Sequence, residues 1–274
     1  MTRNIPKIFA ALLLLSLCVL LPCLTGAERI PPGKNPFSLL MKTKAPISAV
    51  AVQKIHPHDS DAFTQGLIVM DGVLCESTGL LGRSTLACKD IDTGKVLRQI
   101  QLPPEFFGEG IALLKGRIYQ VTWQNENALV YDAASLREIR RMKYSGEGWG
   151  LTSDGKSLLM SDGSSIITIR DPKSFQVQRR IRVQDGDRPV SRLNELEFVR
   201  GEIWANIYME DLIARISHQT GRITGWIDLS ALRSYLPANA RVDVLNGIAF
   251  DAKQNRIWVT GKYWPHLFEI QITP

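Results

Sequence analysis

The sequence is poor in the residues that build the commonest catalytic and metal sites. Its 274 residues include only four histidines and four cysteines. It has no Gly-x-Ser-x-Gly motif, and this absence counts against an α/β-hydrolase. His56 and His58 lie close together, but His218 and His266 are far along the chain and add no second cluster of ligands. We therefore expect no bound metal and no other cofactor.

Long basic runs and a second long apolar run are missing as well. Without Arg3 and Lys7, which precede the first apolar run, 31 of the 33 Lys and Arg remain against 27 Asp and Glu, a formal charge of +4. Such a mild excess without a basic cluster is typical of a solvated surface. We expect no nucleic-acid partner and, because no further segment is long enough to span a bilayer, no stable membrane association.

The one long apolar run lies at the N-terminus, from Ile8 to Leu24. Basic residues precede it, and the small residues Thr25-Gly26-Ala27 follow it, as a signal peptidase requires. The sequence predicts a signal peptide over residues 1–27 and an exported protein, either periplasmic or secreted. An uncleaved membrane anchor and a lipid attached to Cys23 are the alternatives.

Helical periodicity is scarce. Apart from one or two possible turns from Leu229 to Tyr235, no amphipathic stretch reaches ten residues. The glycine-rich stretch from Gly146 to Gly150 does not open a helix, so it is not a phosphate-binding loop. Residues 28–46 contain four prolines and little periodicity, which predicts an extended or disordered arm. Short strand-like segments begin at Ile47 and continue without a linker, so residues 47–274 should form a single catalytic or binding domain.

Five copies of one strand pattern organise this domain. Each copy has an apolar alternation, a turn and a second alternation, which is typical of two antiparallel strands. The residues that open the copies are Gln65, Glu109, Trp149, Asn194 and Asn246. Their separations of 44, 40, 45 and 52 residues match the four-stranded blades of a propeller, which span about 40 to 45 residues.

The fifth copy ends without a fourth strand, whereas residues 47–55 form a strand that belongs to no copy. Pairing this N-terminal strand with the last blade would close the ring and protect the exposed strand edges. The sequence therefore predicts an all-β fold, a five-bladed β-propeller closed by an N-terminal strand.

This geometry gathers distant residues at one mouth of a propeller. The starts of the five first strands form one ring there, and the ends of the second strands form another. The residues of the second ring are Gly79, Trp123, Gly163, Tyr208 and Lys262. One carboxylate, one ammonium, three amides and three large aromatic side chains therefore converge, which is typical of a site for a small ligand.

Most of these residues also have a purely structural interpretation. Glu109 could be a turn or surface residue, and Trp123 and Trp149 could be core residues. Asn194 and Asn246 could bind backbone groups at the starts of strands, and Lys262 could be a solvated surface lysine. For Asn246 the structural role is as well supported as a role in binding. Of Glu195 and Glu197, we expect only one to share the mouth with Asn194.

Two cysteines remain once the signal is removed. Cys75 and Cys88 lie on strand-like runs on either side of a turn at residues 80–83, where antiparallel pairing would bring them together. An exported protein meets an oxidising compartment, so we predict a disulfide between them.

Seven motifs carry a resemblance to a known family. They are Phe63-Thr64-Gln65-Gly66-Leu67, Glu76-Ser77-Thr78-Gly79, Phe107-Gly108-Glu109-Gly110, Gly148-Trp149-Gly150-Leu151-Thr152, Leu193-Asn194-Glu195-Leu196-Glu197, Asp243-Val244-Leu245-Asn246-Gly247-Ile248-Ala249, and Thr260-Gly261-Lys262 with Trp264-Pro265. In this order, over residues 48–274, they resemble the plant and bacterial glutaminyl-peptide cyclotransferases. The resemblance implies a five-bladed propeller that converts N-terminal glutamine into pyroglutamate and releases ammonia, without a catalytic metal. Its partners would be peptides or proteins with N-terminal glutamine, and we expect it to act as a monomer.

The resemblance also implies roles for individual residues. Glu109 matches the acid/base carboxylate, and we expect Asn194 and Lys262 to act with it. The residues expected to bind the substrate are Phe63, Gln65, Phe107, Trp123, Trp149 and Tyr208. Tyr208 is a departure, because the family usually has tryptophan there; the smaller ring keeps an aromatic wall but changes the fit.

The chemistry is consistent with these side chains. The α-amine of the substrate attacks its own side-chain amide, and one carboxylate can move the proton. The side chains of Asn194, Gln65 and Lys262 are the available donors to charge that develops on the amide oxygen. Partial enclosure should raise the pKa of Glu109, and a nearby Lys262 should oppose that rise. Two other classes stay open, a propeller that binds a ligand without turnover and a lactonase-like hydrolase with a metal in its channel.

Overall fold

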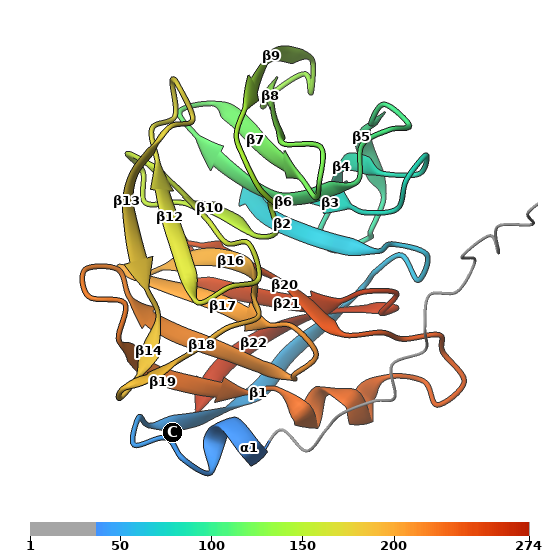
Figure 1. Ribbon diagram of the computed structural model, residues 1–274. Coiled ribbons are helices and arrows are strands. Elements are labelled where there is room, and N and C mark those ends of the chain that lie inside the picture. Colours follow the sequence, from blue (N-terminus) through green and yellow to red (C-terminus); the bar gives the residue numbers. More distant parts are fainter. Residues whose placement is uncertain (1–36, 274) are drawn as a thin grey trace, which may run out of the picture. The chain divides into compact units, whose positions relative to one another are not determined.

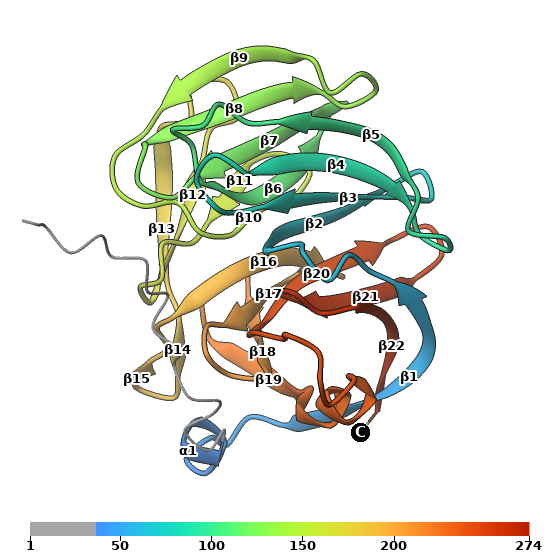
Figure 2. The same cartoon turned by 90° about the vertical axis from the view of Figure 1, so that its right-hand side faces the viewer.

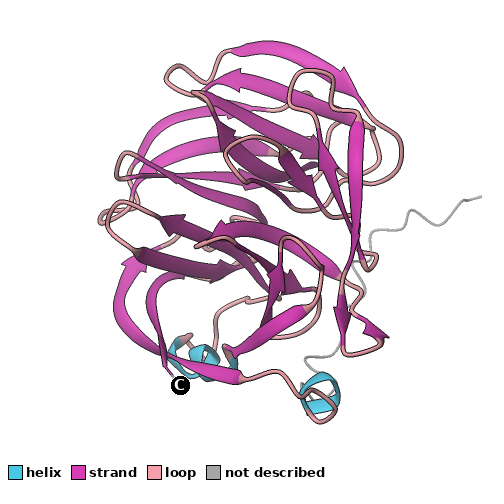
Figure 3. Ribbon diagram, turned by 90° about the vertical axis from the view of Figure 1, so that its left-hand side faces the viewer, coloured by secondary structure: helices cyan, strands magenta, loops and turns pink. Residues whose placement is uncertain are grey.

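The computed structural model describes residues 37–273, and nearly all their regular structure is β-sheet (Figures 1 and 3). Three antiparallel four-stranded sheets follow one another along the chain. The first contains β2 (Thr64–Met70), β3 (Val73–Thr78), β4 (Thr85–Asp90) and β5 (Val96–Gln101). The second contains β6 (Gly108–Leu114), β7 (Arg117–Thr122), β8 (Asn127–Asp132) and β9 (Glu138–Lys143). The third contains β10 (Leu151–Ser153), β11 (Leu158–Met160), β12 (Ile166–Arg170) and β13 (Val177–Arg182).

The remaining long strands form one eight-stranded sheet. Their order is β16 (Leu193–Val199), β17 (Glu202–Ile207), β18 (Leu212–Ser217), β19 (Ile223–Asp228), β1 (Ile47–Pro57), β22 (His266–Thr273), β21 (Arg256–Gly261) and β20 (Leu245–Asp251). β1 pairs antiparallel with β22 over most of its length, as the sequence predicts for the N-terminal strand. It also makes a short parallel contact with β19 at Ile47 and Ser48. This contact joins two groups of four strands into one sheet.

Few other elements occur among the described residues. They are α1 (Phe37–Leu40), the short hairpin of β14 (Gln184–Asp185) and β15 (Arg188–Pro189), and the 3-10 helix η1 (Ser230–Tyr235), which lies where the sequence indicated a helical turn. In the described part of the 28–46 segment, Leu39, Leu40 and Ala45 pack against a buried apolar cluster. The predicted signal, residues 1–27, and residues 28–36 lie outside the described residues. No helix in the described part of the chain is long and apolar enough to cross a membrane.

The first strands of the copies lie at the centre of this arrangement. We call β2, β6, β10, β16 and β20 the inner strands, and their labels lie together in the middle of Figure 2. Each contacts the next in a closed circuit, with β20 returning to β2. Their residues are buried along most of each strand, whereas the outermost strands β5, β9 and β13 are largely exposed. The inner strands are therefore covered on both faces, and the polar side chains that they carry are buried with the apolar ones.

Two carboxylates point from β16 toward neighbouring inner strands. Glu195 accepts hydrogen bonds from the N–H groups of Leu67, at 3.3 Å, and Ile248, at 2.9 Å. Glu197 accepts from the Phe250 N–H at 3.0 Å. The expectation that only one of them shares the mouth with Asn194 assumed that the two side chains face opposite sides of the strand, and that assumption was wrong. Residues two apart in a strand face the same side, so both carboxylates tie inner strands together.

Glu197 makes the stability of the fold depend on pH. Burial raises its pKa to about 8 from an ordinary value of 4.5, against the opposing effect of its hydrogen bonds. The folded state therefore holds a proton that the unfolded state releases, and stability falls as the pH rises from about 4.5 toward 8. We expect Glu197→Gln to reduce the fall in Tm between these pH values, as measured by thermal unfolding. The same change at exposed Glu105 should leave the slope unaltered, and an equal slope in Glu197→Gln contradicts the assignment.

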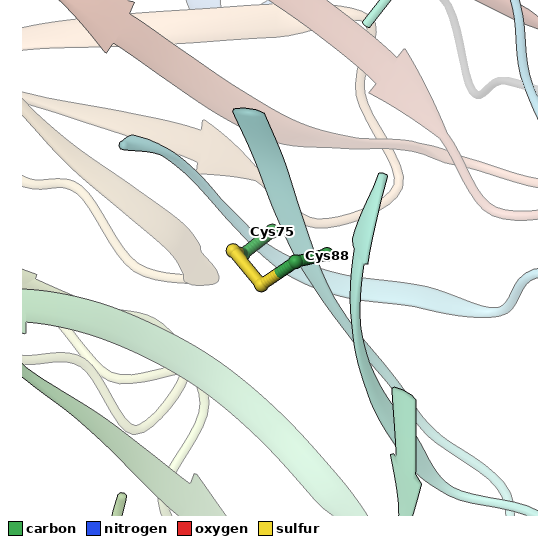
Figure 4. Close-up of a disulfide and its surroundings, with 2 residues drawn as sticks. All are labelled: Cys75 and Cys88. Atoms are coloured by element: carbon green, nitrogen blue, oxygen red, sulfur yellow. A yellow bond between two sulfur atoms is a disulfide. The ribbon is translucent and has the colours of Figure 1, made fainter. Parts of the chain in front are cut away.

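The predicted disulfide is confirmed. Cys75 on β3 and Cys88 on β4 stand directly opposite each other, and their Cα atoms lie 4.0 Å apart (Figure 4). Both side chains are fully buried in an apolar cluster with Ile68, Leu86 and Ile118. The bond therefore locks the register of two neighbouring strands inside the core.

Loss of this disulfide should destabilise the domain. A cross-link restricts the unfolded chain, and closing a loop of this length contributes about 3 kcal/mol. We expect the double variant Cys75→Ala/Cys88→Ala to lower the free energy of unfolding by about 2 to 4 kcal/mol in a denaturant titration. Dithiothreitol should then shift the midpoint of the parent protein and leave that of the variant unchanged. A variant as stable as the parent contradicts this expectation.

Candidate functional site

Register irregularities mark the starts of four inner strands. They lie between Thr64 and Gly66, Gly108 and Ile111, Leu193 and Leu196, and Leu245 and Ile248. These intervals contain Gln65, Glu109, Asn194 and Asn246. A bulge changes the direction in which a side chain leaves its strand, and such features are common beside functional sites. The regular two-residue alternation of the inner strands therefore breaks at the positions predicted to form the site.

Glu109, Gln65 and Asn246 are linked through their side chains. Gln65 Nε2 donates to Glu109 Oε1 at 3.1 Å. Asn246 Nδ2 donates to Gln65 Oε1 at 3.3 Å and to the Thr64 carbonyl at 2.9 Å. Asn246 thus fixes which end of the Gln65 amide faces Glu109. Asn246 therefore has both the backbone contact of a structural residue and a contact within the site.

A second series of buried groups holds the backbone of Glu109. Ser77 Oγ donates to the Glu109 carbonyl at 2.5 Å, and Gln120 Nε2 donates to Ser77 Oγ at 2.7 Å. The Tyr131 hydroxyl donates to Gln120 Oε1 at 3.1 Å. These side chains come from β3, β7 and β8, so neighbouring sheets together fix the point from which the carboxylate projects.

The environment of Glu109 favours its neutral form. The side chain is almost fully buried, and this burial raises the pKa of its carboxyl well above the ordinary value. The ammonium of Lys262 opposes the rise, and the carboxylate of Glu147 adds to it. The direction agrees with the expectation from the sequence. A buried acid with a raised pKa, held by a single amide donor, is suited to take up and return a proton.

Lys262 is a buried cation beside aromatic faces. Its Nζ lies 4.3 Å from the centre of the Phe63 ring and 5.6 Å from that of Tyr208. Burial lowers the pKa of Lys262, while the charges of Glu109 and Asp243 oppose that change. Within residues 37–273 its ammonium forms no salt bridge. The three donor hydrogens of Lys262 therefore remain available to a ligand.

Aromatic rings line one side of this polar cluster. Phe63 meets Tyr263 edge to face with their centres 5.2 Å apart, and meets Phe107 at 6.1 Å. Phe107 in turn meets Trp123 at 5.7 Å. Phe63 and Phe107 are half-buried and Trp123 is exposed, so this side of the cluster can be reached from solvent.

Trp149 and Tyr208 form a second aromatic pair and meet edge to face with their centres 5.6 Å apart. Tyr208 stands where the resemblance implies a larger tryptophan; its ring contacts Trp149 and lies beside the Lys262 ammonium. We call Phe63, Phe107, Trp123, Trp149 and Tyr208 the aromatic wall.

Gly79 and Gly163, which the sequence placed at the ends of second strands, leave space for two of these aromatic side chains. A Cβ on Gly79 would lie 2.3 Å from the Phe107 ring, and one on Gly163 would lie 2.8 Å from the Trp149 ring. Gly163 also has a φ of +79°, which other residues rarely adopt. Both glycines therefore allow an aromatic side chain to lie directly against the backbone.

Asn194 lies beside the segment that carries Trp149. Ser161 Oγ donates to the Asn194 carbonyl and accepts from the Gly150 N–H, both at 2.7 Å, and the Ser161 carbonyl accepts from the Trp149 N–H at 3.0 Å. The side chain of Asn194 is buried, and no hydrogen bond from its amide to another residue is found in the described part of the chain. Its amide is therefore free to meet a ligand.

Sequence reasoning missed one residue of this site, Glu147. Its Oε2 accepts hydrogen bonds from the indole N–H groups of both Trp123 and Trp149, each at 2.9 Å. The only signal was a carboxylate two residues before the predicted ring position of Trp149, inside a glycine-rich stretch. Among residues 37–273, no group of three or more His, Cys, Asp or Glu side chains is arranged to hold a metal ion.

Comparisons with known proteins agree with this geometry. The family model described as glutamine cyclotransferase matches residues 23–272. A glutaminyl-peptide cyclotransferase from Arabidopsis thaliana is 43% identical over 230 residues, which cover 82% of this chain and 72% of the plant protein. The crystal structure of the Myxococcus xanthus glutaminyl cyclase superposes with a TM-score of 0.79 at 34% identity, covering 84% of this chain and 99% of that one.

Proposed function

Because the chain belongs to the glutamine cyclotransferase family, we propose that it converts N-terminal glutaminyl residues of peptides and proteins into pyroglutamate and releases ammonia. The observation that carries this proposal is the buried Glu109 carboxylate, held by Gln65 and lying near a buried cation, Lys262. Two rings of the aromatic wall, Phe63 and Tyr208, lie beside the Lys262 ammonium. Such an arrangement can enclose a short apolar chain that ends in an amine and an amide.

We further propose that the described strands form the five blades of a β-propeller. The sheets β2–β5, β6–β9 and β10–β13 would be three blades, and β16–β19 the fourth. β20, β21 and β22 would form the fifth, with β1 as its outermost strand. The closed circuit of contacts among the inner strands supports this reading.

In the proposed reaction the aromatic wall holds the substrate bent. The α-amine nitrogen must approach the side-chain amide carbon to about 3 to 3.5 Å before a five-membered ring can form. Because both groups belong to one residue, fixing its rotamers supplies much of the acceleration. Half-buried rings can restrict those rotamers without forming hydrogen bonds that the product would have to break.

Glu109 carries the proton in this mechanism. The attacking amine forms the new C–N bond and loses a proton to the carboxylate, which gives a tetrahedral centre. The original C–N bond then breaks, and Glu109 returns the proton to the departing nitrogen, which leaves as ammonia. Water is not consumed, and Glu109 ends the cycle in its starting state.

Charge on the amide oxygen requires donors. Lys262 and Asn194 have free donor groups and suit this role. The sequence also suggested Gln65, but its Nε2 donates to Glu109 and its Oε1 accepts from Asn246. We assign to Gln65 the holding of the carboxylate and to Lys262 and Asn194 the stabilisation of the oxyanion.

Ammonia release from a Gln-initiated dipeptide tests the proposal. The purified protein should release one ammonia for each pyroglutamate formed, at the same rate with and without a chelator. An N-acetylated dipeptide is the control, because its blocked nitrogen cannot attack. No release from any Gln-initiated peptide would favour the non-catalytic ligand-binding propeller, and release abolished by chelator would favour a metal-dependent hydrolase.

The site lies within one chain, so we propose that the protein acts as a monomer. We also propose that residues 1–27 direct export to the periplasm or the medium. The buried Cys75–Cys88 disulfide supports an oxidising compartment. Sequencing the N-terminus of the exported protein tests this directly, since cleavage at the predicted site leaves Glu28 first.

A further inference from the structure

The carboxylate of Glu147 joins two parts of the aromatic wall. Its Oε2 accepts from Trp123 Nε1 and Trp149 Nε1, each at 2.9 Å, and its Oε1 accepts from Gln124 Nε2 at 3.0 Å. Hydrogen bonds to a charged acceptor are stronger than those between neutral groups. One charged group thus holds two indoles, one from the segment after β7 and one from the segment before β10.

Glu147 lies where two groups of aromatic side chains in the wall come together. Phe63, Phe107 and Trp123 follow one another in edge-to-face contact, and Trp149 and Tyr208 form a separate pair. Lys262 connects the two groups at one end, because its Nζ lies over both Phe63 and Tyr208. Glu147 connects them at the other end, through Trp123 and Trp149. In the described part of the chain, these two charged side chains join the two aromatic groups into a closed circuit.

We propose that Glu147 is a positioning residue, which fixes Trp123 and Trp149 in the arrangement that receives the glutaminyl side chain. This inference rests on the proposed cyclisation and extends it to a residue outside the seven family motifs. It predicts that Glu147 acts mainly on substrate binding, through the two indoles, and only weakly on the chemical step. A loose Trp123 or Trp149 would leave the bent substrate less restricted.

The negative charge of Glu147 gives a second way to detect its presence beside the catalytic carboxyl. The charged groups that act on Glu109 are Lys262, on the segment after β21, and Glu147, on the segment before β10; Asp243 faces Lys262 from the neighbouring loop. The phenols of Tyr144 and Tyr208 also lie within the influence of the Glu109 charge, which raises their pKa values. The negative charge of Glu147 raises the pKa of Glu109. Removing that charge should therefore move the acidic limb of the profile of kcat/KM against pH toward lower pH.

Kinetics of three variants test the proposal. We expect Glu147→Ala to raise KM for a Gln-initiated dipeptide about tenfold, equivalent to about 1.4 kcal/mol, with a smaller change in kcat. Glu147→Gln retains one acceptor oxygen, so its KM should lie between those of Glu147→Ala and the parent. Glu126→Gln is the control: Glu126 accepts from the N–H of Gly146, next to Glu147, at 2.8 Å, but both indole N–H groups donate to Glu147 and not to Glu126, so KM should not change.

Fluorescence quenching tests whether Glu147 holds the two indoles, and this measurement does not depend on turnover. Six tryptophans are present, and four of them are at most 2% exposed, Trp204, Trp226, Trp258 and Trp264. Acrylamide therefore quenches mainly Trp123, which is 37% exposed, and the half-buried Trp149. Glu147→Ala should increase the quenching constant, and Glu126→Gln should not.

A double variant decides whether Glu147 acts through the indole N–H groups. In a Trp123→Phe/Trp149→Phe background, which lacks both donors, the further change Glu147→Ala should raise KM by less than about twofold. An undiminished tenfold effect there, or a parent-like KM and quenching in Glu147→Ala alone, overturns the proposal. If the parent protein does not cyclise Gln peptides, the proposed function fails, and the quenching comparison alone decides whether Glu147 holds the tryptophans.

Discussion

Replacing Glu109 with glutamine is expected to reduce kcat for a Gln-initiated dipeptide by about a thousandfold, because the reaction loses the group that moves the proton. The change keeps the size and shape of the side chain. An amide oxygen at this position can still accept from Gln65 Nε2, which now donates to Glu109 at 3.1 Å. The measurement is the initial rate of ammonia release under saturating substrate.

The fold should survive this substitution. Burial raises the pKa of Glu109, so replacing its carboxyl with a neutral amide should not lower the thermal midpoint at neutral pH. An unchanged midpoint with a lost rate separates catalysis from folding. A parent-like kcat in Glu109→Gln would remove this carboxylate from the mechanism.

The second large effect is expected at Lys262. Lys262→Met keeps an unbranched apolar chain between Phe63 and Tyr208 but removes the ammonium that lies 4.3 Å and 5.6 Å from their ring centres. Loss of one donor to a developing oxyanion typically costs about a hundredfold to a thousandfold in kcat. We expect a loss in this range, measured with the same ammonia assay.

Two comparisons sharpen the Lys262 result. Lys253→Met is the matched control, because Lys253 is an exposed lysine paired with Asp71 and lies outside the site. Lys262→Arg retains the charge and should recover part of the lost rate. If Lys262→Met raises KM and leaves kcat unchanged, Lys262 contributes only to the wall and the assignment of the oxyanion donor is wrong.

Spacing and alternation predicted most of the strand organisation. The regular separation of Gln65, Glu109, Trp149, Asn194 and Asn246 placed the inner strands, and the unpaired N-terminal strand indicated its contact with β22. The contact of β1 with β19 was not predicted, because a two-residue parallel pairing leaves no periodic signal. The packing of Leu39 and Leu40 was missed because four nearby prolines dominate the composition of that segment.

The sequence predicted which residues lie near one another in the site, but it did not predict the hydrogen bonds among them. Counting along strands brought Glu109, Lys262 and Trp149 to one end of the inner strands, but it could not show that Asn246 orients the Gln65 amide. That contact depends on local bulges, where a fixed two-residue alternation no longer applies. The same alternation, applied correctly, would have placed Glu195 and Glu197 on one face.

Glu147 shows a different limit of sequence reasoning. Trp123 follows β7 and Trp149 precedes β10, so the carboxylate that binds both indoles lies between two sheets. A pattern within one strand pair cannot reveal such a contact. The resemblance to a known family did not reveal it either, because its motif there begins at Gly148.

A structure of the Glu109→Gln variant with a bound Gln-initiated dipeptide tests the central claim most directly. The account predicts the glutaminyl side chain against Trp123 and Trp149, with the α-amine within hydrogen-bonding distance of residue 109 and the amide oxygen facing Lys262. A peptide bound elsewhere, with its amine remote from residue 109, would contradict it.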